Sequence, residues 1–163
     1  SVATNTPLRR MTRDYDSVSI CLSKGLGAPV GSVLVGSEEF IGQAHRWRKM
    51  FGGGMRQSGI LAAAGMYALE NNIQRMEDDH RRAQSIARAI DDMDHVSVDV
   101  DAVQTNMVYF SANGFTASEV SQKMAKAGID MFDISPTHCR IVTHLHITDQ
   151  DVERVIDALS TLS

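Results

Sequence analysis

Apolar residues near the start of the chain fall into two short runs with glycines between them. The first run lies within residues 17–24 and ends at Lys24, and the second covers residues 32–36. The glycines stand at positions 25, 27 and 31. Short apolar runs bounded by glycine are typical of strands joined by a tight turn. The pattern therefore predicts two strands and places Lys24 where the first one ends.

Apolar residues then recur at helical spacing in two segments. Ser37 is a favourable N-cap, and Glu38 and Glu39 suit the positive end of a helix dipole. A second, long helix is predicted over about residues 57–91, with an apolar face made by Ile60, Leu61, Ala64, Ala68, Leu69, Ile73 and Met76. The first half of this helix is rich in alanine and glycine, which favours close packing between a domain and a subunit partner.

From about His95 the hydrophobic period changes to that of strands. Strands are predicted over residues 96–100, 105–110, 129–134 and 140–145. Thr116 and Glu119 form a capping-box pattern that opens a helix ending before Gly128, and a last helix is predicted over residues 152–162. The order β-β-α-β-β-α predicts a small two-layer α+β domain. We therefore divide the chain into residues 1–90 and residues 91–163.

Composition excludes several classes of partner. The chain has 163 residues and a formal net charge of −4, which argues against binding to nucleic acid. Its apolar runs are too short to cross a bilayer, and it does not open with a signal-peptide pattern, so no membrane partner is expected. Cys21 and Cys139 are far apart and form no C-x-x-C pair, which suits a reducing compartment. We expect a cytoplasmic protein.

The glycines around Lys24 do not match the common nucleotide-binding motifs. Gly25-x-Gly27-x-x-x-Gly31 misses the dinucleotide spacing by one residue, and a P-loop has its lysine after the last glycine. Two hypotheses remain for a lysine at a strand end. It is a solvated surface residue, which this window alone favours, or it is a desolvated amine, which is a nucleophile suited to condensation with a carbonyl group.

The segment Ser-Lys-Gly-Leu-Gly-Ala-Pro-Val-Gly-Ser, residues 23–32, resembles the cofactor-lysine segment of the low-specificity L-threonine aldolases. The resemblance continues in order through residues 46–50, 52–59, 105–106 and 140–145, and so covers nearly the whole chain. These lyases depend on pyridoxal phosphate and have the fold-type I, aspartate-aminotransferase-like architecture. The resemblance implies an α/β fold, in which residues 1–90 end the cofactor-binding large domain and residues 91–163 form a small α+β C-terminal domain.

The resemblance also implies an activity and a set of site residues. The activity is aldol cleavage of L-threonine or L-allo-threonine, both β-hydroxy-α-amino acids, to glycine and an aldehyde. Lys24 would carry pyridoxal 5'-phosphate, and Lys49 and Arg56 would bind the cofactor phosphate, Lys49 in a neighbouring subunit. Arg140 would hold the substrate α-carboxylate with its guanidinium fork, which matches a carboxylate in shape, and Asn106 would orient that group.

The residues by themselves leave structural alternatives open. Lys49 and Arg56 are also compatible with salt bridges at an interface, and Arg140 with an internal salt bridge that satisfies a charge on an apolar strand. Asn106 is about as typical of a hydrogen-bonding residue near a turn.

The resemblance further implies partners outside this chain. It makes the chain the C-terminal half of a longer polypeptide, whose missing N-terminal half supplies the general base and the residue that pairs with the pyridine nitrogen. It also implies a homo-oligomer, a tetramer, with sites shared between subunits. Two alternatives stay open for function: another fold-type I enzyme, such as a β-eliminating lyase or an aminotransferase, or a non-catalytic truncated module.

A metal site is the weaker interpretation of a cluster near the C-terminus. His138, Cys139, His144 and His146 lie close in sequence, and the last two would share a face if residues 140–145 form a strand. No second cluster of ligands accompanies them, and alternating histidines are more often the polar edge of a strand. We predict that the chain binds no metal.

Overall fold

The computed structural model describes residues 1–162 and contains two compact units, Ser1–Arg75 and Met76–Ser163. The division falls at Arg75 and Met76, whereas the sequence analysis placed it between residues 90 and 91. The helix that begins at Met76 therefore belongs to the second unit. Among the described residues, no helix is both long enough and apolar enough to span a membrane.

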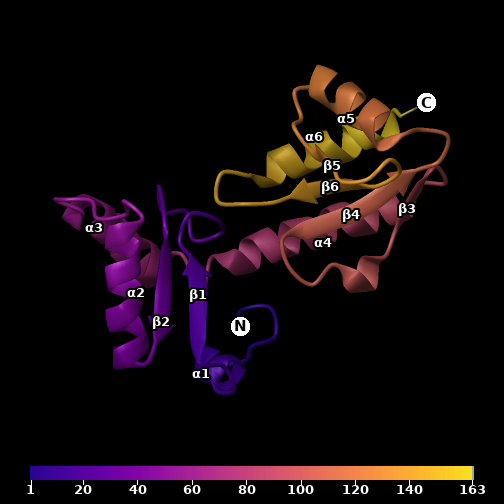
Figure 1. Ribbon diagram of the computed structural model, residues 1–163. Coiled ribbons are helices and arrows are strands. Elements are labelled where there is room, and N and C mark those ends of the chain that lie inside the picture. Colours follow the sequence, from indigo (N-terminus) through magenta and orange to yellow (C-terminus); the bar gives the residue numbers. More distant parts are fainter. Residues whose placement is uncertain (163) are drawn as a thin grey trace. The chain divides into compact units, whose positions relative to one another are not determined.

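The first unit is built on an antiparallel hairpin, with β1 and β2 pairing from Ser17 opposite Gly36 to Cys21 opposite Ser32. Ser37 caps the helix that follows, because its hydroxyl accepts the amide hydrogen of Phe40 at 3.2 Å. This helix, α2, lies against β2 (Figure 1). The elements of this unit are α1 (Leu8–Thr12), β1 (Ser17–Cys21), β2 (Ser32–Gly36), α2 (Glu38–Met50) and α3 (Gly59–Asn71).

The predicted single helix over residues 57–91 is wrong. The chain forms two helices, α3 and α4 (Met76–Asp91), with a break after Asn71. Asn72 is the C-cap of α3, and asparagine competes for backbone hydrogen bonds through its side chain. Here the Asn72 amide group donates to the carbonyl oxygen of Leu26 at 2.7 Å. A contact far away in sequence thus ends a helix that periodicity alone would continue.

The second unit contains a four-stranded antiparallel sheet with the strand order β3-β4-β6-β5. Figure 1 shows α5 and α6 beside this sheet, and α4 packs against α6, β3 and β4. The predicted order of strands and helices after residue 95 is present, with a short 3-10 helix added. The elements are α4, β3 (Val96–Val98), η1 (Val100–Ala102), β4 (Met107–Ala112), α5 (Ala117–Lys126), β5 (Phe132–Asp133), β6 (Cys139–Val142) and α6 (Asp149–Ser160).

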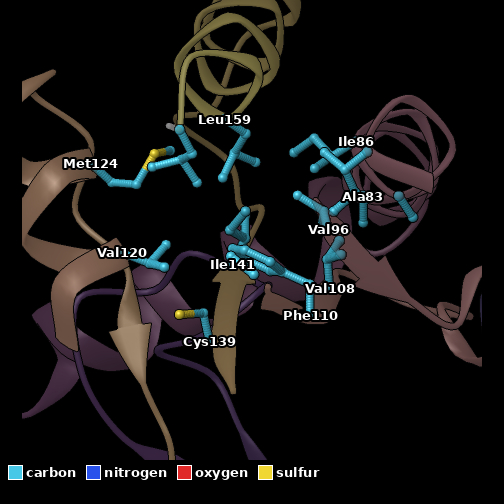
Figure 2. Packing of buried hydrophobic residues seen from close by; sticks show 14 of the residues in the cluster. Ala83, Ile86, Val96, Val108, Phe110, Val120, Met124, Cys139, Ile141 and Leu159 are labelled. Carbon is cyan, nitrogen blue, oxygen red and sulfur yellow. The ribbon is translucent and has the colours of Figure 1, made fainter. Parts of the chain in front are cut away.

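Helices cover one face of this sheet and bury its apolar side chains (Figure 2). Because neighbours along a strand point to opposite faces, alternate residues of β4 and β6 enter the core. The central side chains of the core are Ala83, Ile86, Ile90, Val108, Phe110, Val120, Met124, Cys139, Ile141 and Leu159. The residues between them, such as Met107 and Tyr109, remain exposed on the other face. The sheet is therefore closed on one side and open on the other.

The helices of this unit carry their own end signals. The predicted capping box of Thr116 and Glu119 is confirmed, and Thr148 with Asp151 forms a second one at the start of α6. Asp149, in the first turn of α6, accepts hydrogen bonds from Arg81 and Arg82 of α4, each at 2.8 Å. These ion pairs fix the start of α6 against α4, over the core.

The Asp149 ion pairs predict a dependence of stability on acid. Hydrogen bonds from Arg82 and Arg81 lower the pKa of Asp149 below its ordinary value of 3.8. A carboxylate whose pKa is lower in the folded state adds stability above the unfolded-state pKa, and this stability is lost as pH falls through the folded-state value. Asp149→Asn should therefore flatten the fall in the urea midpoint of unfolding below about pH 4.

Asp157→Asn is the matched control, since Asp157 lies on the same helix and makes no ion pair within the part of the chain that is described. This variant should keep the acid dependence of the unmodified protein. Identical pH profiles for Asp149→Asn and the unmodified protein would show that the Asp149 ion pairs contribute nothing to stability.

Candidate active site

Lys24 lies in the loop between β1 and β2, and backbone hydrogen bonds fold this loop back on itself. The amide of Gly27 donates to the carbonyl of Lys24 at 2.8 Å, and that of Ala28 donates to the carbonyl of Leu22 at 2.9 Å. Gly27 has a φ of +72°, a conformation that glycine adopts without strain. The glycines therefore serve the turn geometry, as the sequence pattern predicts.

Two side chains from the end of α3 hold this loop from outside. Asn72 donates to the carbonyl of Leu26 at 2.7 Å, and Arg75 donates to the carbonyl of Gly25 at 3.4 Å. Leu26 is buried in the first unit. The backbone directly after Lys24 is therefore held by Asn72 and Arg75, although sequence analysis did not assign these residues to the site. The adjacent asparagines at 71 and 72, inside a predicted helix, are the signal that it missed.

Nothing in the first unit covers the Lys24 side chain itself, which is exposed. The hypothesis that apolar neighbours within this chain desolvate the amine is therefore not supported. The loop turns its apolar side chains, Leu22, Leu26 and Ala28, inward and leaves the lysine outside. The chain supplies a fixed, accessible amine at the end of a strand.

Lys49 and Arg56 lie together along an open groove of about 590 Å³ at the end of α2. Its lining is basic and holds no acidic side chain: His45, Arg46, Arg48, Lys49, Met50, Gly54, Met55 and Arg56. Neither Lys49 nor Arg56 forms an ion pair in the described part of the chain. Unneutralised cations that converge on a groove suit an anion such as a phosphate. Lys24 is not among the lining residues.

Glycines give the Lys49 side chain its place in this groove. A Cβ atom at Gly54 would lie 2.6 Å from the Cδ atom and 3.0 Å from the Nζ atom of Lys49, so any other residue would displace the lysine. Gly52 has a φ of +83°, and the amide of Gly53 donates to the carbonyl of Arg48 at 2.8 Å. The run of three glycines thus closes α2 and leaves room for the Lys49 side chain.

Arg140 lies in β6, on the open face of the sheet in the second unit. It is directly opposite Tyr109 of β4 on one side and Phe132 of β5 on the other. Its Cζ atom is 5.0 Å from the centre of the Phe132 ring. Its Nε atom is buried and has no hydrogen-bond partner, and no salt bridge of the described residues involves this arginine. The alternative of an internal salt bridge is therefore not observed.

Asn106 lies just before β4 and opposite Thr143, at the end of that strand pair. Its side-chain amide donates to the carbonyl of Thr143 at 2.9 Å, and the amide of Thr143 donates to the carbonyl of Asn106 at 3.0 Å. Asn106 thus ties the start of β4 to the chain that leaves β6. Arg140 is paired further along the same strands, with Tyr109. The structural alternative for Asn106, a hydrogen-bonding residue, is what this geometry favours.

The histidines near the C-terminus do not share a strand with Cys139. β6 ends at Val142, so the expectation that His144 and His146 lie on one face of a strand is wrong. Cys139 points into the core, where burial raises the pKa of its thiol. Within residues 1–162, no three potential metal-binding side chains come together.

In the first unit, Lys49 and Arg56 line one groove, and Lys24 lies on the loop between β1 and β2. In the second unit, Arg140 lies on the open face of the sheet. Comparison with solved structures identifies the fold to which this arrangement belongs. A candidate L-allo-threonine aldolase of Listeria monocytogenes matches 97% of this chain, over 47% of its own, with a TM-score of 0.77 and 21% identity. Serine palmitoyltransferase of Sphingomonas wittichii matches 93% of the chain with a TM-score of 0.68. The α/β fold of the pyridoxal-phosphate transferases is thereby confirmed.

Sequence comparison then gives the family. The model of the beta-eliminating lyase family matches residues 1–113, and the chain belongs to this family. The low-specificity L-threonine aldolase of Escherichia coli K12 is 45% identical over 154 residues, and low-specificity L-threonine aldolase 1 of Arabidopsis thaliana is 41% identical over 155 residues. These matches cover 94% and 93% of this chain, so the predicted resemblance is confirmed. The chain spans less than half the length of these relatives, 45% and 43%.

The contact between Asn106 and Thr143 predicts a loss of stability on mutation. Asn106→Ala removes the side-chain donor to the carbonyl of Thr143 at the buried end of the β4–β6 pair. This loss should lower the free energy of unfolding by about 1–2 kcal/mol in urea denaturation. Asn113→Ala is the control, since the side-chain amide of Asn113 lies on the surface and makes only a 3.4 Å contact with the carbonyl of Asp94. It should change stability by less than about 0.5 kcal/mol. Unchanged stability of Asn106→Ala, with slower turnover, would instead make Asn106 an orienting residue of the active site.

Proposed function

We propose that this chain forms part of a pyridoxal-phosphate-dependent aldolase that cleaves L-threonine or L-allo-threonine to glycine and an aldehyde. The observation that carries the proposal is the buried Nε atom of Arg140, a donor without a partner in the described chain. A buried unpaired donor costs free energy, and a ligand that completes its hydrogen bond recovers it. The similarity to named L-threonine aldolases supports the same substrate class.

The residues present fit the cofactor in kind. Lys24 offers an accessible primary amine on a loop whose backbone is fixed on both sides, as attachment of an aldehyde requires. Lys49 and Arg56 offer two cations beside a groove without carboxylates, as a phosphate dianion requires. When bound, the cofactor supplies an electron sink for cleavage of the Cα–Cβ bond.

Arg140 would orient the substrate through its α-carboxylate. A guanidinium group presents two parallel N–H donors to a carboxylate, and a donor pair that includes Nε leaves no buried nitrogen unsatisfied. Holding the carboxylate fixes the Cα atom, and with it the bond that is to break. The general base is expected from residues outside this chain.

Lys24→Ala tests attachment of the cofactor in the full-length protein. The unmodified protein, supplied with pyridoxal phosphate, should show a visible absorbance band that borohydride removes, and peptide mapping should then find the reduced adduct on Lys24. Lys24→Ala should lose the band, the adduct and turnover, because no primary amine remains at this position. Lys24→Arg, which keeps the charge but offers no comparable nucleophile, should behave in the same way. An adduct on another lysine in the unmodified protein would contradict the assignment.

Arg140→Ala tests the carboxylate contact. Loss of one partner of a desolvated charge pair should raise KM for threonine and lower kcat/KM by roughly 30- to 5,000-fold in steady-state assays. Arg140→Lys keeps the positive charge but lacks the guanidinium fork, so its KM and kcat/KM should lie between those of the unmodified protein and those of Arg140→Ala. Arg88→Ala, an exposed arginine on α4, is the matched control and should leave both constants unchanged. Unaltered kinetics in Arg140→Ala would make this arginine a structural residue.

β-Elimination is a second candidate, because the family model that matches this chain is named for it. The chemistry of the products separates the two reactions. Aldol cleavage yields glycine and an aldehyde, whereas β-elimination yields ammonia and a keto acid. Assaying all four products from threonine and serine decides which reaction the full-length protein catalyses. Formation of ammonia and a keto acid without glycine would replace aldol cleavage with β-elimination as the assigned reaction.

The active protein would be a homo-oligomer, a tetramer, working in the cytoplasm. Support for a subunit partner comes from α3, whose Ile60, Met66 and Tyr67 are 80%, 60% and 64% exposed in this chain. An apolar surface of this kind is typical of an interface rather than of a solvated helix. Free thiols at Cys21 and Cys139 support a reducing compartment.

A further inference from the structure

Three side chains from three neighbouring strands form a row across the open face of the sheet in the second unit. Phe132 of β5 and Tyr109 of β4 are the direct cross-strand partners of Arg140 in β6. Directly opposed residues of an antiparallel pair point to the same face, so Arg140 stands between two aromatic residues in this row. The other face of these strands is filled by the core, where Cys139 and Ile141 lie.

The two aromatic neighbours are not equivalent. The Arg140 Cζ atom lies over the Phe132 ring, 5.0 Å from its centre, within the range of a cation–π contact. The Tyr109 hydroxyl donates to the sulfur of Met107 at 3.4 Å, so it is directed along its own strand. Phe132 is the aromatic neighbour that contacts the charged end of Arg140.

Phe132 lies on the edge strand of the sheet, and the residue is 60% exposed. A ring beneath a guanidinium plane restricts rotation about the last bonds of the arginine. The Nε atom of this group is buried and lacks a partner in the described chain. Restricting the group before the ligand arrives reduces the entropy that binding must overcome.

We propose that Phe132 is a positioning residue that holds the Arg140 guanidinium group in the plane that accepts a carboxylate. This inference rests on the proposed function for the identity of the carboxylate, an amino-acid substrate. Phe132 acts through Arg140 and does not itself contact the reacting atoms.

The kinetic test uses the full-length protein loaded with its cofactor. Phe132→Ala should raise KM for threonine about 3- to 30-fold and leave kcat within about twofold, because the contact aids substrate and transition state alike. Phe132→Leu should behave like Phe132→Ala, since leucine fills space without a ring face. Phe132→Trp should restore KM, because it provides a stronger ring face. Ile134→Ala, an exposed apolar residue on the same segment, should leave both constants unchanged.

A second measurement does not depend on activity. Phenylglyoxal modifies accessible arginines, and mass spectrometry of the peptide that contains residue 140 gives the rate of labelling. Phe132→Ala and Phe132→Leu should increase this rate about threefold or more, because the guanidinium group loses its cover and becomes mobile, and Phe132→Trp should restore it. The labelling of Arg88 serves as an internal reference.

The two measurements separate the two hypotheses. If the protein shows no aldol cleavage, the proposed function fails, and the labelling rate alone decides the role of Phe132: faster labelling without the ring supports it, and an unchanged rate overturns it. If aldol cleavage is found, wild-type KM and wild-type labelling in Phe132→Ala overturn the positioning role. The positioning role is also overturned if Phe132→Ala and Phe132→Trp both raise KM and neither changes the labelling rate of Arg140.

Discussion

The register between β4 and β6 is the constraint on which the second unit depends. Tyr109 stands opposite Arg140, and Val108 stands opposite Ile141. A shift by one residue would turn Arg140 into the core and bring Ile141 to the open face, because side chains alternate along a strand. The core and the face that carries Arg140 are thus fixed together, by one pairing of two strands.

One-sided burial explains how that register is kept. The helices α4, α5 and α6 fill one face of the sheet with side chains such as Ile86, Met124 and Leu159. Burying a large apolar side chain contributes roughly 1.5–3 kcal/mol, so a slipped register would expose several of them at once. The bond from Asn106 to Thr143 ties the end of the same strand pair. The open face carries Arg140, Tyr109 and Phe132 together with Met107.

The first unit holds cationic side chains that no acidic side chain of the described residues neutralises. Lys49 and Arg56 line a groove without acidic residues, and Lys24 stays exposed on a loop that Asn72 and Arg75 hold. Its own core is small, with Leu22, Leu26, Ala28 and Ala68 among the few buried apolar side chains of this unit. Much of its apolar surface, on α3 above all, is exposed in the described structure. The site residues are therefore fixed locally by backbone turns rather than by deep burial.

Local signals in the sequence determined much of this fold. The glycines around Lys24, the Ser37 cap and the Thr116–Glu119 capping box act over a few residues, so the hairpin, α2 and α5 could be predicted. The order of motifs likewise predicted the similarity to the low-specificity L-threonine aldolases.

Contacts between distant segments could not be predicted in this way. Asn72, the C-cap of α3, bonds to the carbonyl of Leu26, and α3 and α4 are separate helices where periodicity predicts one. The exposure of Lys24 depends on which loop side chains find a core, and the Phe132 ring meets Arg140 only through strand pairing. The sequence by itself determined the elements and the chemistry of the candidate groups. The tertiary structure alone decided their exposure, their partners and the face on which they lie, because these depend on residues brought together from far along the chain.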